Sequence, residues 1–285
     1  MADLTGYELA RTSKVIDKDY ETVWVVVTGA WRIVELAVGW YGGYDDLDIA
    51  ALTIVTHYPY LYLLNTFYLL SSTTATAALA IDVLSISLPI RLLRPRSPTH
   101  SPKATAAEVP DRNIINDRSI IFITSFLGSG IYTVIILLAL RVGLNSFLIN
   151  NFGDIPSLAA RDLTNAANLV FIFLPVGWAV REFILDPSLG SEAQPTLKDV
   201  VDSAFNPATA SLTETMEHNV GSLSKRTKVV FRRTALLSTL ALANTTIQVF
   251  TRVKGAELVG AVGWAALFAM PAWVVGGAYL IVGDA

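Results

Sequence analysis

The chain has 285 residues, of which 53% are hydrophobic and 16% are charged, and its mean hydropathy is +0.50. Soluble globular chains are about a quarter charged, so this composition predicts a membrane protein. The net charge of −3 gives no support for a nucleic-acid partner, and the absence of cysteine excludes disulfides, thiolate nucleophiles and iron–sulfur ligands. Because the chain has only three histidines, we predict no metal site and no cofactor.

The first 21 residues are polar and lack the apolar core of a signal peptide. The apolar blocks that follow are long enough for helices that cross the hydrocarbon core. They predict seven spans, at about residues 22–40, 50–70, 73–93, 119–141, 164–185, 234–252 and 257–282. Because backbone groups cannot stay unpaired in lipid, the chain should form one all-α transmembrane bundle. The turn at residues 71–74 is very tight, so residues 50–93 either cross twice or cross once beside a re-entrant segment.

Four prolines inside the predicted spans are expected to kink them: Pro59, Pro89, Pro175 and Pro271. Two polar loops separate the spans, at residues 94–118 and 186–233. In the second loop, apolar residues recur at helical spacing and predict an amphipathic helix on the membrane surface. These residues are Leu212, Met216, Val220 and Leu223.

Lysine and arginine are concentrated in and beside these two loops, whereas the segment Tyr41–Asp48 has none. The positive-inside rule therefore predicts that both loops face the cytosol. Three spans precede the first loop, so the N-terminus should be lumenal and the C-terminus cytosolic. The acidic segment with Asp45, Asp46 and Asp48 is expected on the non-cytosolic side, and the endoplasmic reticulum is the predicted membrane.

Ionisable groups inside a span cost about 2.5–3.5 kcal/mol each, so each one is a candidate functional residue. Arg32 and Glu35 are three residues apart, either as a self-satisfied ion pair or with Glu35 as an acid beside Trp31. Asp82 has no basic residue one turn away, so it should be protonated or should bond to another helix, for instance to Arg32. His57 is a candidate proton acceptor.

Tyr58, Tyr62 and Asn65 share one stripe of the second predicted span. Aromatic residues at this spacing are usually packing or interface anchors. Alternatively they wall an apolar pocket, in which aromatic faces would stabilise a carbocation. On this second interpretation the substrate-binding residues are Trp31, Arg32, Tyr58, Tyr62 and Asn65.

Several protein classes are excluded by missing residues. The last predicted span has no lysine for a retinal Schiff base. The chain has no Gly-x-Ser-x-Gly run, no phosphate-binding loop and no His-Glu-x-x-His run. No internal repeat is evident, which weakens the case for an inverted-repeat transporter.

In size, in helix number and in its buried carboxylates beside aromatic side chains, the chain resembles the small seven-helix membrane terpene cyclases of fungal meroterpenoid pathways. The resemblance implies acid catalysis, in which a carboxylic acid protonates an isoprenoid and the chain folds onto the resulting cation. The Asn-x-Ala-Trp-Glu run of that family is absent, and the second helix here reads His57-Tyr-Pro-Tyr-Leu-Tyr. Glu35 and Asp82 are therefore candidates by position alone.

These observations predict a cofactor-independent cyclase or isomerase that acts on an apolar, isoprenoid-like substrate within the bilayer. Glu35 or Asp82 would be the general acid, and the other carboxylate or His57 would take the proton back. A first alternative is a non-catalytic membrane assembly factor or complex subunit whose protein partners are unknown. A second alternative is a small-molecule transporter lined by Arg32, Glu35 and Asp82.

Overall fold

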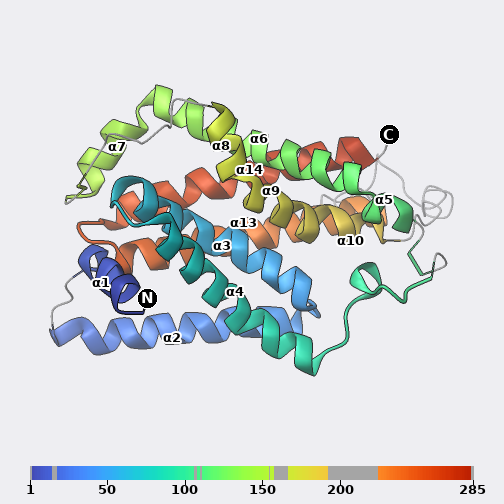
Figure 1. Ribbon diagram of the computed structural model, residues 1–285, viewed down its shortest axis with the longest axis horizontal. Coiled ribbons are helices and arrows are strands. Elements are labelled where there is room, and N and C mark those ends of the chain that lie inside the picture. The colour runs from blue at the N-terminus through green and yellow to red at the C-terminus, as the bar shows by residue number, and fades with distance from the viewer. Residues whose placement is uncertain are drawn as a thin grey trace, which may run out of the picture.

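The computed structural model describes residues 2–14, 18–105, 108–109, 111–153, 155–156, 166–191 and 224–283. Over these ranges the chain forms helices and no β-strand, apart from two isolated bridges. The predicted all-α fold class is confirmed, and the long helices run along a shared axis as an elongated bundle (Figure 1). The predicted amphipathic helix with Leu212 and Met216 lies outside the described residues.

The helices follow one another with short connections. The N-terminal part contains α1 Ala2–Thr12, α2 Lys18–Tyr41, α3 Asp46–Phe67, α4 Ser72–Leu93 and the single turn η1 Pro98–His100. The middle part contains α5 Arg112–Asn116, α6 Arg118–Val142, α7 Leu144–Asn151, α8 Ala166–Ile172, α9 Leu174–Val180, the π-helical turn η2 Arg181–Leu185 and α10 Asp186–Leu189. The C-terminal part contains α13 Lys225–Arg252 and α14 Leu258–Gly283.

Five of the described helices are long and apolar enough to cross a membrane: α2, α3, α4, α6 and α14. The bent pair formed by α8 and the segment 174–189 makes a sixth if it counts as one span. Residues 46–93 form two separate helices of 22 residues each, α3 and α4, and each is long enough for its own crossing. The fold class thus holds, with five or six spans by length and composition where the sequence predicts seven.

The predicted span at 234–252 lies in α13, which is not among these helices because polar residues lower its hydropathy. Asn244, Thr245 and Gln248 are all buried, and α13 packs along α14 and α3. Polar groups that are hydrogen-bonded inside a bundle do not face lipid, so they do not prevent a crossing. That α13 crosses the membrane stays a prediction.

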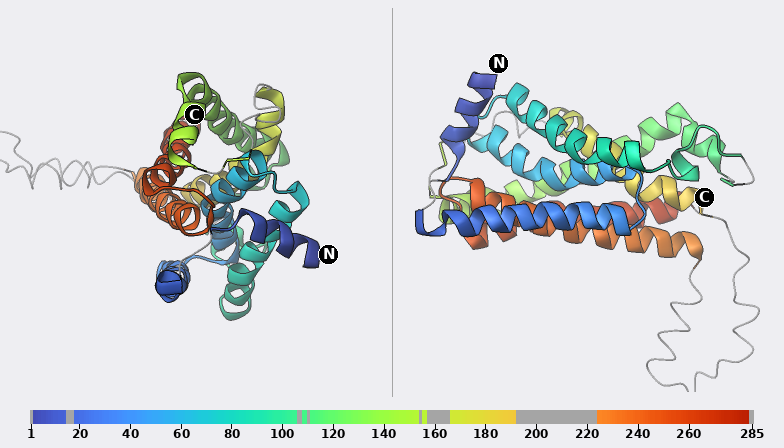
Figure 2. Two further views of the ribbon diagram at one scale, coloured as in Figure 1. Left: turned by 90° about the vertical axis from the view of Figure 1, so that its left-hand side faces the viewer. Right: turned by 90° about the horizontal axis from the view of Figure 1, so that it is seen from below.

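The central helix of the bundle is α3, in which 78% of the apolar window is buried, against 17% in α4 and 6% in α2. It packs against α4, α13 and α9, whereas α6 packs against α9 and α14. In the end-on view α2 runs along the outside of the other helices (Figure 2). The apolar faces of α2 and α4 that point away from α3 are therefore suited to contact lipid.

The chain bends by 51° between α8 and α9. The bend lies just before Pro175, where the sequence predicts a kink. A break in a helix frees backbone carbonyls, which must find donors inside a membrane protein. Here Ser129 Oγ donates to the carbonyl oxygen of Val170, and the Tyr58 hydroxyl donates to that of Ile172 at 2.6 Å. The other three prolines lie inside continuous helices: Pro59, Pro89 and Pro271.

One end of the bundle, which we name the loop end, contains residues 42–45, the described residues of 94–117, the C-terminal end of α10 and the N-terminal end of α13 (Figure 1). The acidic segment was expected on the opposite side from the basic loops, and the structure corrects this. Asp46 pairs with Arg96, and Asp48 pairs with Arg233, so acidic and basic segments meet at one end. The physical reason is that two helices of spanning length, α3 and α4, separate the acidic segment from the first basic loop, so the chain returns to the same end.

Candidate functional site

The first polar cluster, the Arg32 cluster, lies between α2, α3 and α4. The Arg32 guanidinium donates to Glu35 Oε2 at 3.0 Å and, from its other nitrogen, to Asp82 Oδ1. It also contacts His57 Nε2 at 2.8 Å. The structure therefore brings together the three ionisable groups and the histidine that the sequence singles out, and Arg32 is hydrogen-bonded to both carboxylates.

The contacts of His57 determine its tautomer. A guanidinium has only N–H donors, so His57 Nε2 must accept from Arg32. The proton then lies on Nδ1, which is 3.1 Å from the carbonyl oxygen of Thr53 and can donate to it. His57 is 1% exposed, and both of its ring nitrogens are engaged in this arrangement. In this arrangement neither ring nitrogen of His57 is free to act as the predicted proton acceptor.

Asn244 of α13 completes the Arg32 cluster, and sequence reasoning missed it. Its side-chain oxygen accepts from Trp31 Nε1 at 2.8 Å and from Gln248 Nε2 at 2.9 Å, and its nitrogen donates to the carbonyl oxygen of Thr56 at 2.9 Å. Trp31, a predicted pocket residue, thus joins α2 to α13. The feature of the sequence that could have revealed it is the group of polar residues Asn244, Thr245 and Gln248 in an otherwise apolar segment.

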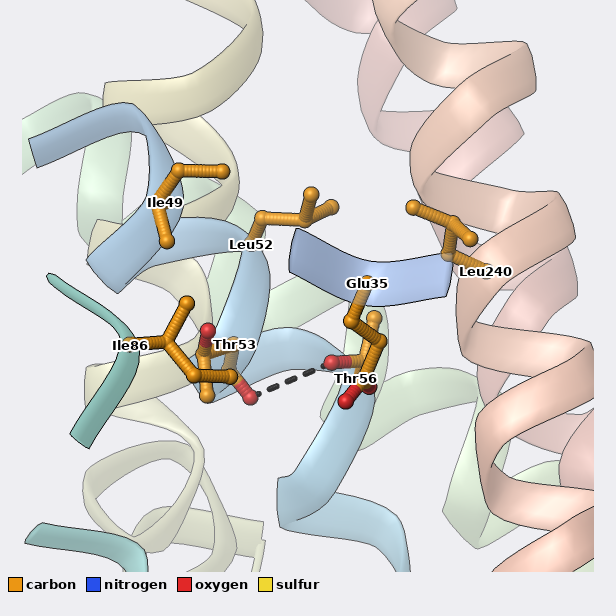
Figure 3. Close-up of a pocket in the computed structure, with 7 residues that line it drawn as sticks. All are labelled: Glu35, Ile49, Leu52, Thr53, Thr56, Ile86 and Leu240. Atoms are coloured by element: carbon orange, nitrogen blue, oxygen red, sulfur yellow. Dashed lines mark hydrogen bonds between the residues drawn. The ribbon is translucent and has the colours of Figure 1, made fainter. Parts of the chain in front are cut away.

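The cavity beside Glu35 has a volume of about 20 Å³. Glu35 reaches into it from α2, and Thr56 Oγ1 donates to the carbonyl oxygen of Thr53 at 3.3 Å along its wall (Figure 3). Its other lining residues are Ile49, Leu52, Ile86 and Leu240. A volume of this size holds one water molecule. An isoprenoid chain does not fit beside this carboxyl group.

The other predicted pocket residues lie away from Glu35. Tyr58 supports the break before α9 through its hydroxyl, and Tyr62 stacks against Trp264 with ring centroids 6.2 Å apart. Asn65 donates to the carbonyl oxygen of Leu70 at 2.8 Å and so holds the α3–α4 turn. The side chains of Tyr58, Tyr62 and Asn65 all line a groove of about 290 Å³ between α3, α4 and α8. The structure therefore places Trp31 and Arg32, but not these three side chains, beside the predicted acids.

The second polar cluster is at the loop end, and the acidic segment organises it. Asp45 accepts from His100 Nδ1 at 2.7 Å, from Ser97 N at 2.9 Å and from Ser97 Oγ at 2.8 Å. Burial by itself would raise the pKa of Asp45, but the hydrogen bond and charge of His100 hold this pKa well below its usual range. Burial likewise acts to lower the pKa of His100, and Asp45 outweighs it and raises this pKa.

Arg181 is the most deeply buried cation of the loop end, with 1% of its side chain exposed. It donates to Asp186 Oδ2 at 2.7 Å, to Thr124 Oγ1 at 3.1 Å and to the carbonyl oxygen of Ile115 at 3.0 Å. It also contacts Glu182 Oε2 at 3.3 Å. Arg181 therefore ties the π-helical turn to α5 and α6.

A sequence model of the bouquet formation protein 3 C-terminal domain matches residues 117–275, which is more than half of the chain. The match begins at the N-cap of α6 and ends within α14. Neither the comparison with curated proteins nor the comparison with solved structures finds a match.

This match overturns the resemblance to membrane terpene cyclases and the predicted role in secondary metabolism. Helix number, size and buried acids beside aromatic rings are features that many small membrane bundles share, so they carried no family information. The chain belongs to the family defined by the bouquet formation protein 3 C-terminal domain.

Proposed function

We propose that this chain is a non-catalytic membrane protein that acts in meiotic bouquet formation, as an assembly factor or as a subunit of a membrane complex. The observation that carries the proposal is the family match over residues 117–275. Its partners are the lipid bilayer and one or more proteins. No apolar small-molecule substrate is needed.

The geometry of the Arg32 cluster supports a structural role for its charges. Arg32 is paired with both Glu35 and Asp82, and the cavity beside Glu35 has room for one water molecule only. A general acid needs a free proton and a substrate within hydrogen-bond reach. A transport path lined by these charges would likewise need a larger opening. We therefore propose that the cluster fixes α2 and α4 against α3 and α13.

We further propose a nuclear-envelope or endoplasmic-reticulum-related membrane, with the loop end on the cytosolic or nucleoplasmic side. The basic residues of segments 94–118 and 186–233 support this orientation. The N-terminus is then lumenal and the C-terminus is on the side of the loop end. The long segments of the loop end are the proposed contact region for protein partners.

The test is complementation of a gene deletion in the host organism. D82N leaves Arg32 with Glu35 as its partner, and E35Q leaves it with Asp82, so both variants should fold and restore the bouquet. L212S/M216S alters the apolar stripe that sequence spacing predicts for the long loop, and it should fail to restore it. Protein levels are measured by immunoblot for every variant.

The opposite pattern would contradict the proposal. If D82N or E35Q is present at the normal level and does not function, while L212S/M216S functions fully, then a chemical or transport role for the carboxylates replaces the assembly role.

A further inference from the structure

Three side chains of the loop end converge on one point: His100 of η1, Glu182 of η2 and Asp186 of α10. Their ligand-type atoms all lie within 4.8 Å of one another, and His100 Nε2 is 3.8 Å from Glu182 Oε1. The side chains of His100 and Asp186 are 3% and 2% exposed, and that of Glu182 is 12% exposed. One imidazole and two carboxylates are thus gathered at a buried position.

Two atoms of this group have no hydrogen-bond partner, His100 Nε2 and Asp186 Oδ1. An unsatisfied buried polar atom costs about 1–3 kcal/mol, and native proteins contain few of them. Here the two atoms belong to side chains that line the same cavity. A bound ligand with affinity for both nitrogen and oxygen would satisfy them together.

The histidine is held in the orientation that metal-bound histidines adopt. His100 Nδ1 bonds to Asp45 Oδ2 at 2.7 Å, and Asp45 is itself fixed by the backbone and side chain of Ser97. A carboxylate on one ring nitrogen fixes the ring and makes the other nitrogen a better ligand. That other nitrogen, Nε2, is the one without a partner.

The two carboxylates are positioned by Arg181, which uses only one oxygen of each. It donates to Asp186 Oδ2 at 2.7 Å and to Glu182 Oε2 at 3.3 Å. Asp186 Oδ1 stays without a partner, and Glu182 Oε1 is the oxygen nearer His100. Arg181 and the charged His100 face the three carboxylates Asp45, Glu182 and Asp186. Metal binding would release the proton of His100, which leaves an excess negative charge of about two for a divalent cation.

We propose that His100, Glu182 and Asp186 bind a zinc ion, with water from the adjoining cavity as the fourth ligand. That cavity has a volume of about 270 Å³. Zinc accepts imidazole nitrogen and carboxylate oxygen at about 2.0–2.2 Å, so tetrahedral ligand atoms lie about 3.3 Å apart. The ligand atoms lie within 4.8 Å of one another, so they would move together by up to about 1.5 Å to reach that spacing. The other two arginines of the cavity are engaged elsewhere, Arg96 with Asp46 and Arg112 with the carbonyl oxygen of Pro102.

The ion would fasten the segment 94–117 to the end of α10. His100 precedes the family-matched region, whereas Glu182 and Asp186 lie within it, so the site would join the two halves of the chain. The sequence predicted no metal site because the chain has only three histidines. The ligands of this site were not recognised because His100 lies 82 positions before Glu182 and no ligand-spacing motif connects them.

The test uses the full chain purified in detergent, with any affinity tag removed and metal stripped by a chelator. Zinc is then titrated against a competing indicator, and bound zinc is counted by mass spectrometry. We expect one zinc per chain. H100N and D186N should each weaken binding at least 100-fold, whereas T99V, a change in the wall of the same cavity, should leave it unchanged.

H100N is chosen because an asparagine amide can still donate to Asp45 while Nε2 is lost. Helicity and gel-filtration profile check that each variant folds. X-ray absorption at the zinc edge of the wild-type protein gives an independent result, with imidazole scattering expected in the first shell. Absence of stoichiometric zinc, equal affinity in H100N, or a first shell without imidazole would each overturn the site, whatever the outcome of the bouquet experiments.

Discussion

At the scale of single residues, Arg32 links the charged and polar side chains between α2, α3 and α4. It is the cation for both Glu35 and Asp82, and it holds His57 in a single tautomer. When one partner of a buried ionic group is removed, the charges of the other partners are left uncompensated. The folded protein is then destabilised, because burial of an uncompensated charge is unfavourable. The Arg32 cluster is therefore expected to respond to substitution as one unit.

R32M tests this expectation. The change should lower the free energy of unfolding by about 1–3 kcal/mol, below the 3–5 kcal/mol of fully buried pairs because 31% of the Arg32 side chain is exposed. R141M, at the exposed end of α6, is the matched control and should change stability by less than about 0.5 kcal/mol. Denaturant unfolding in detergent micelles measures both.

The triple variant R32M/E35Q/D82N separates charge compensation from packing. All three charges are then absent, so we expect recovery of more than half of the loss seen in R32M. Equal unfolding free energies for R32M and R141M would contradict a structural role for the Arg32 cluster.

At the scale of elements, α6 and α9 approach each other closely at Gly177. A Cβ added to Gly177 would overlap the carbonyl oxygen of Ser125 and would lie 2.6 Å from the backbone nitrogen of Ser129. Small residues allow membrane helices to approach in this way, and van der Waals packing then stabilises the pair. The contact positions α9, and with it the π-helical turn that carries Arg181 and Glu182.

G177A should therefore force α6 and α9 apart and cost about 1–3 kcal/mol of stability. Gly130 of α6 provides the control, because a Cβ there would meet no atom within 4 Å. G130A should be neutral or slightly stabilising, since alanine is the better helix former. Thermal unfolding of the two variants in the same detergent measures the difference in stability. A G177A protein as stable as G130A would refute the close approach.

At the scale of the whole molecule, local patterns predicted the helices, but relations between distant residues were only partly accessible. Apolar runs gave the spans, and the rule that a lone buried charge needs a partner gave the pairing of Asp82 with Arg32. Asn244 was missed because one sequence does not tell which helices are neighbours. The acidic segment was misplaced because its lack of lysine and arginine was interpreted without counting the two predicted spans between it and the first basic loop. Its arginine partners, Arg96 and Arg233, are 50 and 185 residues away.

Orientation is also a whole-molecule property, and the absence of cysteine makes it easy to measure. Single cysteines at Lys103, in the loop-end segment, and at Asn150, at the other end of the bundle, are both exposed. In sealed right-side-out microsomes we expect a membrane-impermeant maleimide to label K103C at once and N150C only after the membrane is opened. Labelling of N150C alone in sealed vesicles would reverse the proposed orientation.

The most direct test of the central claim is deletion of the gene in its host, followed by two measurements on the same meiotic cells. The bouquet is scored by imaging chromosome ends, and small molecules are profiled without preselection. A non-catalytic bouquet factor predicts that the bouquet is lost while the small-molecule profile stays unchanged. An intact bouquet with accumulation of a linear prenylated precursor would contradict the account and would point to a membrane enzyme.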